Sequence, residues 1–222
     1  MTIAITDAGT TISGLHASTP RPLPFDETIS ATAFLLERDA GNLLIYSTGE
    51  LARDADSFRA LGGVDRQYLN HWHESLFGGL EGTGIDAPLF VHRDDSPQTA
   101  RRLHVRGAFS KRHLLDDDFE VIPTPGHTPG ATAYLWDTGD HRLLFTGDTL
   151  YLRDGEWVAA VLDSSDRSRY LESLELLRGL DFDVLVPWAA STDQAPYVVL
   201  EDGEAPERIA AVIDRVRAGA SG

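Results

Sequence analysis

Hydrophobic and polar residues alternate along two long segments of the chain, and both segments predict β-hairpins. Residues 29–48 carry apolar runs on either side of the turn-forming sequence DAGN at 39–42. Residues 131–150 repeat this arrangement around DTGD at 137–140. Small polar residues and glycine favour tight turns, while the alternating flanks favour strands with one buried face.

Apolar residues recur at every third or fourth position in three other segments, which predicts amphipathic helices. These are residues 49–63, which close on two glycines, residues 166–180, and residues 204–220, with Pro206 near the first turn. A shorter helix is expected near 95–102. Single strands are expected in segments 65–70, 86–95, 119–130 and 182–191, and an extended surface segment in the proline-rich residues 16–28.

This order of elements indicates two sheets packed face to face with helices outside them. The length of 222 residues suits one domain with a large core, and we expect a single domain over residues 1–222. No apolar run approaches the roughly 18 residues that span a bilayer. The N-terminus lacks the basic start and apolar block of a secretory signal. The absence of cysteine excludes disulfides and a thiolate nucleophile, and it is compatible with the cytoplasmic location that we expect.

The charge balance narrows the class of partner. Asp and Glu outnumber Lys and Arg by 35 to 19, which gives a formal net charge of −16. Such a surface repels phosphate backbones and anionic lipids, so we expect no nucleic acid or membrane partner but a small-molecule substrate. A homo-oligomer stays open, because the proline-rich segment is suited either to cover a pocket or to cross to a second copy.

Four residues from three segments carry the candidate chemistry. His71 and His73 are two apart after an apolar run, and in an extended chain this spacing puts both imidazoles on one side. His127 lies in the turn sequence PTPGHTPG at 123–130, and Asp148 follows an apolar strand in the sequence FTGD. The histidine pair alone is weak evidence, and the two further segments strengthen it. Three neutral imidazoles and a carboxylate make a suitable site for a divalent cation such as Zn²⁺.

These motifs resemble those of the metallo-β-lactamase superfamily, nearest to its glyoxalase II-like hydrolases. The resemblance covers residues 28–190 and implies an α+β fold, an αββα sandwich of two mixed β-sheets with helices on the outer faces. The matching pieces are HWHES at 71–75, PTPGHTPG at 123–130 and FTGDTLY at 145–151, with VLVPWAAS at 184–191 in the place of the last family motif.

The resemblance also implies a ligand set. His71, His73 and His127 match the family's histidines for one metal ion, and Asp148 matches the carboxylate that bridges two ions. We therefore expect these four residues to hold a metal, zinc in the first place, with iron or manganese as alternatives.

The chain departs from the family pattern at the second metal position. Ser75, Leu76 and Trp188 stand where the family places one aspartate and two histidines. A serine hydroxyl stays protonated near neutrality, leucine offers no ligand atom, and tryptophan offers only a donor N–H. We therefore expect one ion, with Trp188 and Leu76 filling the space of the second.

The function expected from these residues is hydrolysis of a small ester, thioester or lactone-like substrate by one metal ion and its bound water. Asp148 is the candidate catalytic residue, acting as ligand and base. Ser75 cannot be a base, and strict alternation would point Glu74 away from the histidines. Specificity is expected to reside in segments 11–28, 74–87 and 148–165.

Other functions stay open at this stage. The main alternative is a catalytically inactive protein that binds a small molecule in the former active-site pocket, and the loss of the usual base and second metal favours it. Redox chemistry is also open, because the superfamily includes iron-dependent oxidoreductases. A nuclease is disfavoured by the negative charge and the missing second metal position.

Overall fold

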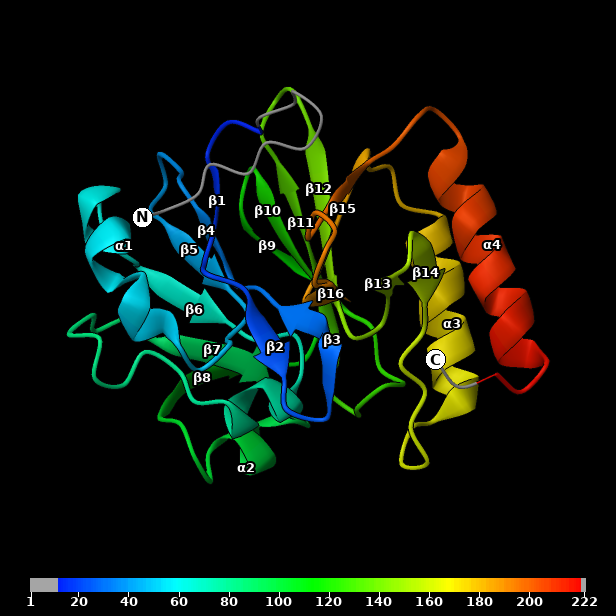
Figure 1. The fold of residues 1–222 in the computed structure, drawn as a ribbon, viewed down its shortest axis with the longest axis horizontal. Helices are drawn as coiled ribbons and strands as arrows, with labels where there is room; N and C mark the ends of the chain where they lie inside the picture. Colours follow the sequence, from blue (N-terminus) through cyan, green and yellow to red (C-terminus); the bar gives the residue numbers. More distant parts are fainter. Residues whose placement is uncertain (1–11, 221–222) are drawn as a thin grey trace.

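The computed structural model describes residues 12–220 and shows two six-stranded sheets facing each other, with helices on the outer sides (Figure 1). In spatial order, the first sheet consists of Leu15–Ala17 (β1), Phe34–Leu36 (β4), Leu43–Ile45 (β5), Arg66–Tyr68 (β6), Leu89–His92 (β7) and Val105–Phe109 (β8). The second consists of Val198–Val199 (β17), Val184–Pro187 (β15), Arg142–Gly147 (β12), Thr132–Asp137 (β11), Phe119–Pro123 (β10) and His113–Asp116 (β9).

Each of these sheets contains both parallel and antiparallel neighbours, so the expected αββα sandwich of two mixed sheets is confirmed. Both predicted hairpins are present, because β4 pairs antiparallel with β5 and β11 pairs antiparallel with β12. Strands β8 and β9 were not predicted. Their segment, RRLHVRGAFSKRHLLD at 101–116, is dominated by polar residues and has no buried alternating face.

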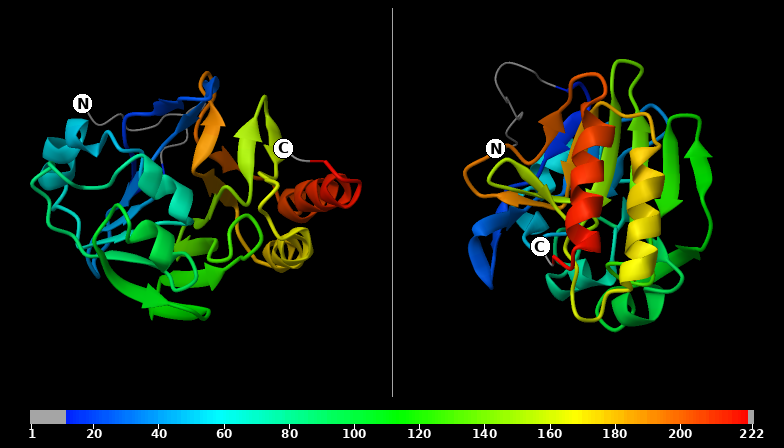
Figure 2. Two further views of the ribbon diagram at one scale, coloured as in Figure 1. Left: turned by 90° about the horizontal axis from the view of Figure 1, so that it is seen from below. Right: turned by 90° about the vertical axis from the view of Figure 1, so that its right-hand side faces the viewer.

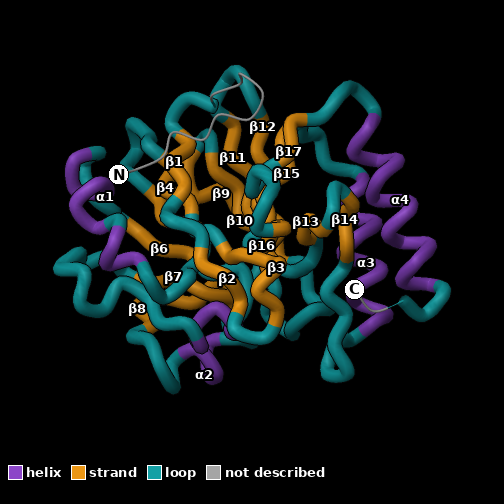
Figure 3. Tube along the Cα trace, viewed as in Figure 1, coloured by secondary structure: helices purple, strands orange, loops and turns teal. Residues whose placement is uncertain are grey.

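A third, smaller sheet also lies outside the prediction (Figure 3). In spatial order it consists of Glu156–Val158 (β14), Tyr151–Arg153 (β13), Ala189–Ser191 (β16), Asp26–Ala31 (β3) and Arg21–Leu23 (β2). Strand β13 closely follows β12, and β16 closely follows β15, so the chain passes twice from the second sheet into the third. Asp148 and Trp188 lie at these two crossings.

Two helices cover the outer face of the second sheet. Helices Arg167–Arg178 (α3) and Glu204–Arg217 (α4) run side by side (Figure 2). Tyr170, Leu174 and Leu177 of α3 are fully buried, which confirms the predicted apolar stripe. The remaining helical segments are Ala55–Ala60 (α1), Ser96–Thr99 (α2) and the 3₁₀ turns Leu51–Arg53 (η1) and Trp72–Leu76 (η2).

Aromatic rings fill the space between the two large sheets. Phe34, Tyr46 and Phe145 meet edge to face, with ring centroids 6.1 to 6.3 Å apart. No helix among the described residues is long and apolar enough to cross a bilayer. The residues on which the expected absence of a secretory signal depends lie almost entirely at 1–11, outside the described part of the chain.

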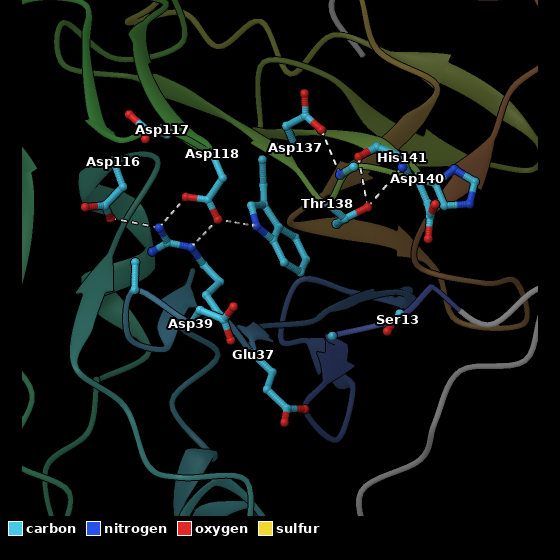
Figure 4. A pocket seen from close by; sticks show the side chains of 15 residues that line it. Ser13, Glu37, Asp39, Asp116, Asp117, Asp118, Asp137, Thr138, Asp140 and His141 are labelled. Atoms are coloured by element: carbon cyan, nitrogen blue, oxygen red, sulfur yellow. Dashed lines mark hydrogen bonds and ion pairs between the residues drawn. The ribbon is translucent and has the colours of Figure 1, made fainter.

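An arginine joins the two large sheets at one edge. The Arg38 side chain, only 1% exposed, donates to Asp116 at 2.8 Å and to both carboxylate oxygens of Asp118 at 2.5 and 3.0 Å. Trp136 Nε1 also donates to Asp118. Figure 4 shows Asp116 and Asp118 in the wall of an acidic cavity of about 820 Å³, which contains none of the predicted metal ligands.

Replacing Arg38 should cost stability in a pH-dependent way. Arg38→Met removes charge-assisted hydrogen bonds, so we expect the free energy of unfolding to fall by about 2 kcal/mol at pH 7 in urea titrations. As a control, Arg112→Met breaks the exposed pair with Glu120 and should cost less than about 1 kcal/mol.

The pH profile provides a second check. Partial burial acts in the opposite direction, but hydrogen bonds from Arg38 hold the pKa of Asp118 below its usual value. The stabilisation is therefore present above the unfolded carboxyl pKa of about 4 and is lost as pH falls through the lower folded value. A difference between wild type and Arg38→Met that stayed constant down to pH 3 would contradict this account.

Candidate metal centre

His71 and His73 lie at the start of the 3₁₀ turn η2, so the extended chain that the sequence predicted for both holds for His71 alone. His71 is the residue before the turn and keeps an extended backbone, while His73 lies inside the turn. Their ring centroids are 5.1 Å apart. The turn, rather than strand alternation, therefore brings the two imidazoles together.

Glu74 explains why the chain turns here. Its fully buried carboxylate accepts the backbone N–H groups of Ser47 at 2.8 Å, Asn70 at 2.7 Å and His71 at 3.1 Å. Burial raises the pKa of Glu74, although His71 and the backbone amides act in the opposite direction. This side chain fixes the turn from behind and is not a base for the site.

His127 is held in the PTPGHTPG turn by its backbone and its ring. Its Nδ1 lies 2.7 Å from the carbonyl oxygen of Ala160, which only accepts, so Nδ1 carries the proton and Nε2 is free for the site. Gly126 has φ of +148°, and a Cβ there would lie 2.4 Å from Tyr170 Cα. Only glycine allows α3 to pack this closely behind the histidine.

Asp95 connects the two histidine segments. Its buried carboxylate accepts the Trp72 N–H at 3.0 Å, the Thr128 hydroxyl at 2.6 Å and the Gly130 N–H at 2.8 Å. Sequence reasoning missed this residue, because nothing in the stretch HRDD distinguishes Asp95 from its exposed neighbour Asp94. Its partners are far away in sequence.

Asp148 takes its position from the tight turn that ends β12. Gly147 has φ of +56°, and a Cβ there would lie 1.9 Å from Asn70 Cγ. The Gly147 N–H donates to Tyr46 Oη, which itself donates to the Val186 carbonyl, both at 2.8 Å. The FTGD sequence thus sends the chain past Asn70 and leaves the carboxylate of Asp148 facing the histidines.

The four predicted residues converge. Asp148 Oδ2 lies 3.4 Å from His71 Nε2 and 3.5 Å from His127 Nε2. His73 Nδ1 lies 3.0 Å from His127 Nε2. One ring nitrogen from each histidine lies within 4.8 Å of the other two.

The donor atoms fit a metal ion. His71 Nδ1 faces two acceptors, Asn70 Oδ1 at 3.0 Å and Glu74 Oε1 at 3.3 Å, while its buried Nε2 has no hydrogen-bond partner among the described residues. A tetrahedral ion about 2.05 Å from each nitrogen separates two ligand nitrogens by about 3.3 Å, close to the 3.0 Å between His73 and His127. An unpaired buried nitrogen aimed at other ligands is the arrangement that a cation completes.

The carboxylates of Asp148 and Glu74 favour one positive charge beside them. Protonated His71 supplies this charge in the absence of an ion. Burial lowers the pKa of His71, but Asp148 and Glu74 outweigh burial and raise this pKa to about 10. Burial and repulsion by His71 and His127 lower the pKa of His73 to about 3. Burial also lowers the pKa of His127. Burial opposes ionisation of Asp148, but the histidines lower its pKa to about 2.

The sequence profile of the Metallo-beta-lactamase superfamily matches residues 54–189, well over half of the chain. The protein belongs to the metallo-β-lactamase superfamily. The resemblance that the motifs indicated is thereby confirmed, and the matched region includes His71, His73, His127 and Asp148.

The chain is similar to two curated enzymes and to a solved structure. Hydroxyacylglutathione hydrolase from Erwinia tasmaniensis is 30% identical over 164 residues, 68% of this chain and 58% of that protein. The enzyme of the same name from Salmonella typhi is 28% identical over 120 residues, 53% and 46% of the two chains. The chain thus spans about half the length of these relatives. A metallo-beta-lactamase from Pontibacter korlensis superimposes with a TM-score of 0.68 at 16% identity, over 94% of this chain and 97% of that one.

Ser75 and Trp188, two of the residues expected to leave a second metal position without ligands, have their polar side-chain atoms engaged by backbone carbonyls. The Ser75 hydroxyl turns back and donates to the Trp72 carbonyl at 2.6 Å. Trp188 is buried, its Nε1 donates to the Ser47 carbonyl at 2.8 Å, and its ring lies 5.5 Å from that of His71. Trp188 thus packs beside His71, whereas Leu76, which was expected to fill the space of a second ion, is 51% exposed and lines an open cavity.

Asp95→Ala should test whether the buried network positions the ligands. We expect a loss of about 2 kcal/mol in unfolding free energy, because three donors lose their acceptor. Zinc affinity, measured by competition with a chromophoric chelator, should fall by about 10- to 100-fold. Asp94→Ala is the matched control, and we expect it to leave both quantities near wild type. Equal effects of the two substitutions would rule out a positioning role for Asp95.

Proposed function

We propose that this protein is a hydrolase of a small ester, thioester or lactone-like substrate, with one divalent ion held by His71, His73, His127 and Asp148. The observation that carries the proposal is the buried Nε2 of His71, which has no hydrogen-bond partner in the described part of the chain and lies 3.4 Å from Asp148 Oδ2. Nitrogen and carboxylate donors suit zinc first, with iron and manganese as alternatives.

The residues around the ion have two roles, orienting the attacking water and keeping the histidines in the state that binds metal. When bound, the ion supplies a Lewis acid that polarises a carbonyl and lowers the pKa of a water molecule towards 7. Asp148 is ionised and partly exposed, so its carboxylate can accept a hydrogen bond from the attacking water and orient it. Asn70, Glu74 and Ala160 keep the outer nitrogens of His71 and His127 protonated, which leaves their inner nitrogens free to bind.

The relatives suggest where to begin the search for a substrate. Two of them carry the name hydroxyacylglutathione hydrolase, which makes thioesters the first class to test. The net charge of −16 supports a small-molecule substrate over a nucleic acid.

A second candidate is a non-catalytic protein that binds a small molecule in the same pocket. Ser75, Leu76 and Trp188 favour it, because they remove the family's second metal position and its usual base. The two candidates differ in their dependence on metal.

Metal content is the first test. Protein purified without added metal should contain about one equivalent of zinc, iron or manganese by elemental analysis. A chelator should lower the melting temperature, because an ion bound only to the folded state stabilises it. His71→Ala and His127→Ala should abolish the metal, while Ser75→Ala should retain it. Metal-free protein with a melting temperature insensitive to chelator would favour the non-catalytic candidate.

Hydrolysis is the second test. The chain contains no cysteine, so thiol release from thioesters can be followed with Ellman's reagent without a protein background. Asp148→Asn should reduce kcat by about 100-fold or more, because it removes the carboxylate that orients the water. Ser75→Ala should change kcat by less than about threefold, since that hydroxyl is engaged with Trp72. Equal rates in wild type and Asp148→Asn would remove Asp148 from the proposed mechanism.

A further inference from the structure

Exposed apolar side chains gather at the mouth of the candidate metal centre. Phe25 is 78% exposed, Leu76 51% and Leu162 44%, and all three line one cavity of about 450 Å³. The same cavity reaches His73 and His127. Large apolar side chains are rarely left exposed together unless they form a binding surface.

These side chains come from the three segments expected to carry specificity. Phe25 belongs to segment 11–28, Leu76 to 74–87 and Leu162 to 148–165. The folding of distant segments thus places one apolar residue from each around the same opening.

A second cavity of about 320 Å³ adjoins the first. Phe25, Leu162, Trp188 and Asp148 line both cavities, so the Asp148 carboxylate stands between two lobes. The smaller lobe adds the apolar side chains of Leu23, Ile29, Ala160, Val161 and Ala189.

The arginines that line the lobes are already engaged. Arg21 donates to the Thr48 carbonyl at 2.8 Å, and its guanidinium lies over the Phe77 ring. Arg153 forms an ion pair with Asp26 at 2.9 Å. An anionic substituent would compete with these contacts and would also approach a protein of strongly negative charge. The lobes therefore favour uncharged groups.

We propose that the substrate is an uncharged ester or thioester with an aliphatic acyl chain of several carbons. The chain lies in the larger lobe against Leu76, Leu162 and Phe25, which places the scissile carbonyl beside His73, His127 and Asp148. This assignment rests on the proposed hydrolase function. It selects a neutral carrier of the acyl group over a charged one such as glutathione.

Binding of inert analogues tests the pocket independently of catalysis. The probes are S-butyl, S-hexyl and S-octyl thioethers of N-acetylcysteamine, which is neutral, and of glutathione, which is anionic. Thioethers cannot be hydrolysed here, and calorimetry on the full, zinc-supplemented protein measures their Kd. We expect Kd to fall about two- to fourfold for each added CH₂ and to be at least about tenfold lower for the neutral series.

Substitutions in the wall locate the chain. Leu162→Ser and Leu76→Ser should each weaken the S-octyl probe by about tenfold or more and flatten the dependence on chain length. Leu114→Ser is the matched control, because Leu114 is a 63% exposed leucine on β9 that lines neither lobe. It should leave Kd unchanged, and circular dichroism should show that all three variants are folded.

Several results would overturn the assignment. These are no binding, a Kd independent of chain length, tighter binding of the glutathione series, or equal losses in Leu162→Ser and Leu114→Ser. Failure of the hydrolase proposal looks different, because the neutral S-octyl probe would still bind while no ester or thioester is turned over. Turnover of short and long acyl groups at equal kcat/KM, with no length dependence in binding, would contradict the pocket assignment and leave the hydrolase proposal intact.

Discussion

The candidate site depends on a buried carboxylate that lies behind its histidines. Glu74 is fully buried, and a buried charge is tolerated only when its acceptor positions are filled. The N–H groups of Ser47, Asn70 and His71 fill them, and each of these groups belongs to a segment that must be in place for the turn to form. The cost of leaving Glu74 unpaired therefore fixes the backbone that carries the histidines. Asp95 does the same between this turn and the His127 turn, so the imidazoles are oriented by the fold before any ligand arrives.

The sequence patterns predicted the architecture and the candidate metal-binding residues. They did not predict the hydrogen bonds that hold those residues in place. Hairpins, the stripe of α3 and the four converging residues are visible as periodicity or motifs. Strands β8 and β9 are not, because they lie at sheet edges and bury little. Four of the five strands of the third sheet are only three residues long, too short to show alternation. The carboxylate of Asp95 and the Nδ2 group of Asn70 bind partners 23 to 76 residues away, and such contacts leave no local signal. The histidine pair was placed on an extended chain because its spacing suits a strand, whereas the hydrogen bonds of Glu74 impose a turn.

Trp188 combines a departure from the expected family pattern with a place in the wall of the pocket. It stands at the crossing from the second sheet into the third, where the family places a metal-binding histidine, and its N–H is occupied by the Ser47 carbonyl. Its ring packs against Phe77, with centroids 5.3 Å apart, and lines both lobes of the pocket. The residue that stands in place of the expected histidine therefore also supplies an apolar wall. A pocket with such walls holds its ligand largely by shape and hydrophobic contact.

The apolar walls of the pocket explain how a single ion would be enough for catalysis. A bimetallic centre can hold both a nucleophile and a substrate oxygen through its ions, whereas a single ion leaves more of the positioning to the protein. Two apolar lobes on either side of Asp148 can supply that positioning, because a substrate with an apolar chain is aligned by where the chain fits. The fixed histidines and the apolar walls then act together. Rigid polar contacts position the ion, and burial of the substrate's apolar chain positions its carbonyl group. Weakening the contacts that hold the ion would reduce turnover while substrate still binds, and weakening the apolar walls would reduce substrate binding while the ion stays in place.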